Sequence, residues 1–167
     1  MAKGAEVLNW IDALPTDLRQ SVMAEMKPLR VKQGALIYER FSPAKGLYRV
    51  VSGTTRLFSL APDGRELIYK INGPSESFGD LGAIDGGPYT LSAEAMTDCE
   101  LLFLSCSSLN DLRRKYPALE TALLTFVTRI ARTSIMSIEV ATIFPLPARI
   151  ASRLTFLAAS ARERGEP

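Results

Sequence analysis

The side chains that most often carry catalysis or bind metals are scarce in this sequence. Its 167 residues include no histidine and two cysteines, Cys99 and Cys106. Without histidine there is no Ser-His-Asp or Cys-His nucleophile and no His-ligated haem, zinc or copper site. Two thiolates are too few for an ordinary iron–sulfur cluster. We therefore expect a protein that is not an enzyme, with no catalytic residue, no metal and no permanent cofactor.

One short segment has the composition of a ligand-binding turn. Phe78 is followed by Gly79, Asp80, Leu81 and Gly82. Backbone N–H groups beside glycine can face an anion, and a carboxylate there could accept hydrogen bonds from sugar hydroxyls. Gly and Asp are more often found in turns that only reverse the chain, so the segment alone leaves both interpretations open.

The elements that must position this segment change in character along the chain. Residues 1–28 have apolar side chains at helical spacing and predict two short helices, separated at Pro15 and ended at Pro28. Residues 29–105 contain short apolar runs bounded by turn residues, which is typical of antiparallel strands in a sandwich or barrel. The predicted strands are Leu29–Lys32, Leu36–Tyr38, Leu47–Ser52, Thr55–Leu60, Glu66–Asn72, Thr90–Met96 and Cys99–Ser105. Pro62-Asp63-Gly64 predicts a hairpin turn between two of them.

Helices follow the strands. Ser108 to Asp111 predict a capping box for a short helix that ends at Pro117. Residues 118–144 contain no Gly or Pro, enough for about 40 Å of helix. They carry a heptad seam with a second apolar stripe beside it, so one stripe can cover the strands while the other needs a partner. The dimerisation residues predicted from the seam are Leu119, Leu123, Phe126, Ile130, Val140 and Phe144. We expect a homodimer; a single long core helix is the alternative.

Charge and hydropathy argue against nucleic-acid binding by the body of the chain and against a membrane span. Four of the 20 basic residues and two of the 18 acidic residues lie in residues 145–167, so the remainder carries no net charge and is not an electrostatic nucleic-acid binder. The longest run without Asp, Glu, Lys or Arg is Leu101 to Asn110, too short to cross a membrane. We expect a cytoplasmic protein without a membrane partner.

The order of these segments resembles the cyclic-nucleotide-binding β-roll of the Crp/Fnr family of transcription regulators. The segments that carry the resemblance are Lys32–Tyr38, Gly46–Gly53, Asp63–Glu66, Phe78–Leu81, Ala95–Glu100 and Pro145–Ala151. The resemblance implies an α+β chain with a jelly-roll-like, antiparallel β-roll, flanked by N-terminal helices and followed by a long dimerisation helix. It implies a sensor domain over residues 1–107, the short and long helices over 108–144, and over 145–167 a hinge with the first helix of a truncated winged helix-turn-helix.

The same resemblance implies a ligand site in the roll. The predicted ligand residues are Gly79, Asp80, Leu81, Tyr89, Thr90, Thr133, Ser134 and Ser137. The cAMP binders of the family have Glu where Asp80 stands and, for the cyclic phosphate, Arg where Tyr89 stands. Because a buried phosphate without a cation is costly, we expect a polar cavity without a cation and weak binding of cyclic nucleotides. The effector, a cyclic nucleotide or another small molecule, is left open.

These observations favour the effector-sensing and dimerisation part of a Crp/Fnr-type DNA-binding regulator, which would contact DNA through a domain not present in this chain. The alternative is a stand-alone cyclic-nucleotide-binding module of the kind attached to kinases and channels. Residues Pro145–Ala151 resemble the transcription-factor branch and favour the first interpretation. An enzyme on a cupin-like barrel would need a His-rich metal site, which this sequence cannot supply.

Overall fold

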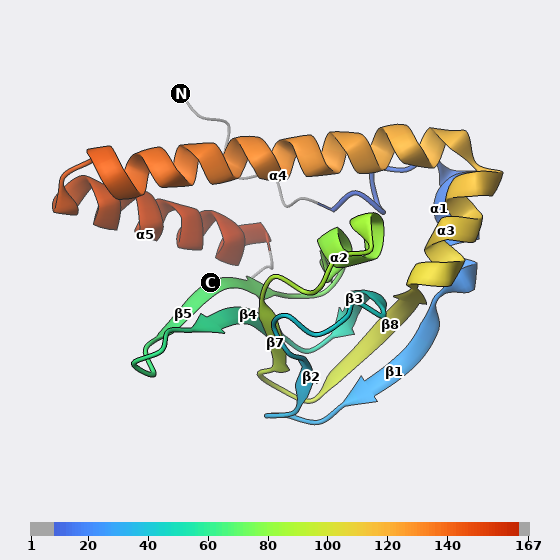
Figure 1. The fold of residues 1–167 in the computed structure, drawn as a ribbon, viewed down its shortest axis with the longest axis horizontal. Helices are drawn as coiled ribbons and strands as arrows, with labels where there is room; N and C mark the ends of the chain where they lie inside the picture. The colour runs from blue at the N-terminus through green and yellow to red at the C-terminus, as the bar shows by residue number, and fades with distance from the viewer. Residues whose placement is uncertain (1–8, 164–167) are drawn as a thin grey trace.

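The computed structural model describes residues 9–163, which fold into a β-roll with helices packed at one end and a long helix running across it (Figure 1). The strands form two four-stranded antiparallel sheets with the orders β1-β8-β3-β6 and β2-β7-β4-β5. The strands are β1 (Lys27–Val31), β2 (Leu36–Tyr38), β3 (Gly46–Ser52), β4 (Thr55–Leu60), β5 (Glu66–Asn72), β6 (Ser77–Phe78), β7 (Ser92–Ala95) and β8 (Cys99–Ser105). The helices are α1 (Thr16–Glu25), α2 (Asp80–Asp85), α3 (Cys106–Lys115), α4 (Pro117–Ile143) and α5 (Leu146–Glu163). The predicted α+β class with an antiparallel roll and a long helix is confirmed.

Turn chemistry accounts for the hairpin that joins β4 and β5. The two strands pair antiparallel from Thr55↔Asn72 to Leu60↔Glu66. In the turn between them, Gly64 has a φ of 82°, a left-handed conformation that glycine adopts without a Cβ clash. The Ala61 N–H donates to the Arg65 carbonyl at 2.8 Å and closes the hairpin. The prediction from Pro62-Asp63-Gly64 is therefore confirmed.

Element boundaries differ from the sequence prediction near the N-terminus. Residues 10–13 form a turn instead of a helix, and the earlier part of that predicted helix lies outside the described residues. The side chains of this turn bind distant parts of the chain, as shown below. Pro28 does not end a helix but lies inside β1, at the edge of its sheet, where a missing N–H costs no ladder hydrogen bond. The helix predicted to begin at Ser108 begins at Cys106, because Ser105 is its N-cap and accepts a hydrogen bond from the Ser108 N–H.

Two buried clusters hold the molecule together. One lies inside the roll and is built around the rings of Tyr38, Tyr48, Phe78 and Tyr89. The other lies between the roll and the helices and joins the N-terminal turn, α1, α3 and the first half of α4. Its fully buried members include Ile11, Val22, Leu47, Leu104, Leu109 and Leu119. The short cassette β6–α2 lies where the two clusters approach each other.

The C-terminal helices form the outer layer. α4 runs across the whole molecule, and α5 folds back beneath it toward the β4–β5 hairpin (Figure 1). The Arg153 guanidinium donates to the Ile68 carbonyl on β5 at 3.2 Å, so α5 contacts the roll. Among the described helices, none combines the length and apolar character needed to span a bilayer.

Candidate ligand-binding site

The β6–α2 cassette lines a cavity of about 180 Å³ between the roll and α4. Of the predicted ligand residues, five line it: Gly79, Asp80, Leu81, Tyr89 and Thr90. Gly79 has a φ of 80°, and a Cβ there would approach the Gly46 carbonyl oxygen and the Tyr89 ring at 3.2 Å. Glycine therefore lets the chain turn from β6 into α2 directly against the roll.

Asp80 is the buried carboxyl group of the cavity, with 5 % of its surface exposed. The indole N–H of Trp10 donates to Asp80 Oδ1 at 2.8 Å. Burial raises the pKa of Asp80, while the hydrogen bond from Trp10 opposes that shift. The Ser77 hydroxyl lies close enough to favour the charged form of Asp80, but it makes no hydrogen bond of normal geometry and is a buried polar group without a partner.

Hydrogen bonds from Arg49 and Asn9 hold the N-terminal turn that carries Trp10 in place. The buried Arg49 guanidinium binds both Asp12 carboxylate oxygens at 2.8 Å and the Asn9 side-chain oxygen at 3.0 Å. The Asn9 amide donates in turn to the Ser75 carbonyl, just before the cassette. The Trp10 ring packs 6.4 Å from the Phe126 ring of α4. The turn thus connects the strand β3, the cassette and α4, a role that apolar periodicity could not reveal.

Tyr89 is a structural wall of the cavity, with 3 % of its surface exposed. Its ring stacks on Tyr38 with centroids 3.7 Å apart. Its hydroxyl donates to the Gly46 carbonyl and accepts from the N–H groups of Lys45 and Gly46. An arginine has no acceptor for the N–H groups of Lys45 and Gly46, so it would not simply add a cation to the existing pocket.

The expectation of a cavity without a cation is wrong, because Lys70 on β5 lines it. The Lys70 ammonium forms an ion pair with Glu76 at 2.9 Å. In the β4–β5 pairing Lys70 lies opposite Leu57, which also lines the cavity, and a β-bulge between Leu57 and Phe58 places Ile68 opposite Phe58 instead. Simple alternation along the strand therefore does not give the placement of Lys70. Most of the remaining wall is apolar, which also corrects the expected polar character.

The predicted hydroxyl roof does not cover the cavity in this chain. Thr133, Ser134 and Ser137 are exposed and lie outside the cavity lining. The Thr133 hydroxyl donates to the Arg129 carbonyl and the Ser137 hydroxyl to the Thr133 carbonyl, which is the usual back-bonding of such residues in helices. Phe126 and Ile130, one to two turns earlier on α4, line the cavity instead.

The predicted dimerisation seam divides into two parts. Leu119, Leu123 and Phe126 are buried within the chain itself, so their assignment as partner contacts is corrected: they join α4 to the helical core. Ile130 and Val140 are half-buried and Phe144 is 45 % exposed. The large apolar residues that α4 leaves exposed are Leu124, Ile135, Met136, Ile138 and Ile143. Leu124 and Ile138 belong to the second apolar stripe of α4 and are 69 % and 63 % exposed.

The fold and the cassette define the class of protein. The sequence matches the cyclic nucleotide-binding domain family over residues 28–116, more than half of the chain, and the chain belongs to that family. Within it, the resemblance to Crp/Fnr transcription regulators is confirmed. The CRP-like cAMP-activated global transcriptional regulator of Mycobacterium tuberculosis is 29 % identical over 134 residues, which is 80 % of this chain and 60 % of the relative.

Solved structures of transcription regulators have the same fold as this chain. The catabolite activator protein of Thermus thermophilus superposes with a TM-score of 0.73 at 26 % identity, over 80 % of this chain and 63 % of that one. The N-terminal domain of a transcriptional regulator from Streptomyces coelicolor A3(2) gives a TM-score of 0.67 at 31 % identity, over 80 % of this chain and 95 % of that domain. In the sequence comparison, the chain spans about 60 % of the length of the M. tuberculosis relative.

Proposed function

We propose that this chain is the effector-sensing and dimerisation part of a Crp/Fnr-type transcription regulator of the cytoplasm. The observation that carries the proposal is that Phe126 and Ile130 of α4 line the same cavity as Asp80 and Tyr89. A ligand in the roll would therefore contact the helix whose far half exposes an apolar surface. DNA would be bound by the homodimer through a winged helix-turn-helix, of which α5 is the first helix.

The dimer part of the proposal can be tested on α4. Changing both Leu124 and Ile138 to Glu places charges on the second stripe without touching the chain's own core, and light scattering should then show a monomer. Thr125→Glu, exposed on a different face of α4, is the matched control and should remain dimeric. A wild-type chain that is monomeric at tens of micromolar concentration would contradict the proposal.

The sensing part is tested by calorimetry with cAMP, cGMP and cyclic di-GMP. We expect weak binding of all three, because Tyr89 stands where the family's cAMP binders carry an arginine and its hydroxyl is committed to the backbone of Lys45 and Gly46. Low-micromolar binding of a cyclic nucleotide would show that this chain supplies the phosphate contact by another group.

A further inference from the structure

The charges at the cavity do not favour an anion. Among the residues that line it in the described part of the chain, Lys70 is the one cation and Asp80 the one carboxyl group. Lys70 is already paired with the carboxylate of Glu76. Whether Asp80 is charged or protonated, these three groups together carry no net positive charge. An anionic ligand would therefore enter a site whose cation is already neutralised.

The ion pair between Glu76 and Lys70 is costly to break. Its side chain is 7 % exposed, and Lys70 is 33 % exposed. One Glu76 oxygen accepts from the Gly73 N–H at 2.7 Å, and the other binds Lys70 at 2.9 Å. If Lys70 moved to a ligand, Glu76 would be left as a buried charge without a cation, and such a state is strongly unfavourable.

The rest of the cavity fits a small ligand with one polar group. A volume of about 180 Å³ is close to the roughly 150 Å³ apolar cavity that holds a benzene molecule and below the roughly 300–1,000 Å³ of pockets for drug-sized ligands. The wall includes Tyr38, Phe78, Leu91 and Phe126. The Ser77 hydroxyl lies beside Asp80, is 7 % exposed, makes no hydrogen bond of normal geometry and offers one polar contact.

We propose that the cavity selects a small uncharged ligand, one ring with a hydrogen-bonding group, and that Glu76 determines this selectivity by holding Lys70 away from anions. The inference rests on the proposed sensing role of the roll and names its class of effector. Glu76 does not line the cavity and is thus a positioning residue for Lys70.

Benzamide and benzoate test the proposal, because they have nearly the same shape and differ in charge. Each is titrated into the ¹⁵N-labelled chain, and binding is followed at the amides of Gly79 and Leu81 and at the indole N–H of Trp10, the one tryptophan of the sequence. These signals report the cavity and not the exposed surface of α4. The variants are Glu76→Gln and, as matched control, Glu100→Gln, which removes the same charge from an exposed pair with Arg30.

In the wild type, benzamide should bind at least about tenfold more tightly than benzoate, the effect of one charge-assisted contact. Glu76→Gln frees Lys70 and should raise benzoate affinity by about tenfold or more, with benzamide unchanged. Glu100→Gln should behave as the wild type. Equal wild-type binding of the two probes, an unchanged benzoate affinity in Glu76→Gln, or an equal gain in Glu100→Gln would overturn the inference while leaving the sensing role intact.

A second variant covers the case in which Glu76→Gln does not fold. Lys70→Met combined with Glu76→Gln replaces the ion pair by two neutral side chains. Benzamide should still bind and benzoate should not; loss of benzamide binding in this folded variant would contradict the proposal. Shifts from neither probe in any variant would overturn the sensing role of this cavity together with the inference, whereas the dimer test on α4 would be unaffected.

Discussion

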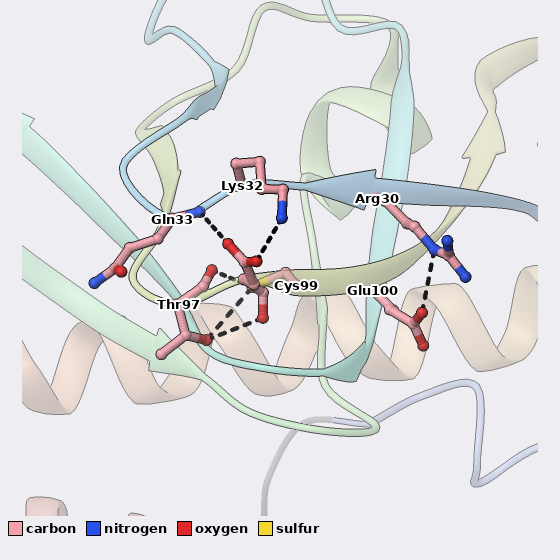
Figure 2. Close-up of polar contacts among 7 residues, drawn as sticks. Arg30, Lys32, Gln33, Thr97, Cys99 and Glu100 are labelled. Carbon is pink, nitrogen blue, oxygen red and sulfur yellow. Dashed lines mark hydrogen bonds and ion pairs between the residues drawn. The ribbon is translucent and has the colours of Figure 1, made fainter.

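Two aspartates in this molecule perform the same task in different surroundings. Asp80 accepts the Trp10 indole N–H at 2.8 Å, and Asp98 accepts the Lys32 ammonium at 2.8 Å and the Gln33 N–H at 2.9 Å. Each joins segments that are more than 60 residues apart in the sequence. Asp80 is 5 % exposed, whereas the Asp98 side chain is 62 % exposed. Figure 2 shows Lys32 and Gln33, the two residues that bind Asp98.

The difference shows that burial, more than distance, decides what such a contact contributes. The hydrogen bond from Lys32 lowers the pKa of the exposed Asp98, whereas burial raises the pKa of Asp80 at the cavity. Solvent surrounds Asp98 and can replace a lost partner, whereas Trp10 is 4 % exposed and its indole N–H has much less access to water. The neighbouring ion pair between Arg30 and Glu100, 3.2 Å long and also shown in Figure 2, is exposed to solvent in the same way.

The largest effect is expected from removing the buried carboxyl group. Asp80→Ala leaves the Trp10 indole N–H without an acceptor, and the free energy of unfolding should fall by about 1–3 kcal/mol. Asp98→Ala, its matched control, should leave the urea midpoint close to that of the wild type. Equal losses in the two variants, measured by urea denaturation, would contradict the role given to burial.

The two carboxyl groups should also give opposite pH dependences. The folded-state pKa of Asp80 lies above its ordinary 3.8, so the stability difference between the wild type and Asp80→Asn should fall as pH rises from 3.8 through that raised pKa. The folded-state pKa of Asp98 lies below 3.8, so its contribution is complete above 3.8 and is lost as pH falls through the lowered pKa. Urea denaturation of the wild type, Asp80→Asn and Asp98→Asn across this range measures both slopes, and slopes of the same sign would contradict the comparison.

The strands could be predicted because their signals are local. Alternating apolar residues and turn residues such as Pro62-Asp63-Gly64 act over a few positions, and β4 and β5 have the predicted bounds. The cassette was identified by its resemblance, but its neighbours were not. Trp10 lies 70 positions from Asp80, and nothing in the helical spacing around Trp10 indicates that its indole reaches the cavity.

The long helix shows the other limit of the sequence prediction. Its length was predicted to within one residue at each end, but a heptad pattern does not say which stripe faces the chain's own core. Leu119 and Leu123 satisfy the seam and are buried against the N-terminal turn and α3. The missing information was the position of Trp10 and Ile11. Both residues are buried in the same core cluster as Leu119 and Leu123, and the Trp10 ring packs on Phe126 of α4.

The smallest expected effect concerns salt, and it separates the two lysine–carboxylate pairs. The side chains of Lys32 and Asp98 are 87 % and 62 % exposed, so their attraction should be screened when the Debye length falls from about 10 Å at 0.1 M to about 3 Å at 1 M salt. The stability difference between the wild type and Asp98→Asn should then shrink toward zero. Lys70 and Glu76 are 33 % and 7 % exposed, so the difference between the wild type and Glu76→Gln should persist. If salt removed both differences equally, the Lys70–Glu76 pair would behave as a surface pair, and Glu76 could not restrain Lys70 at the cavity.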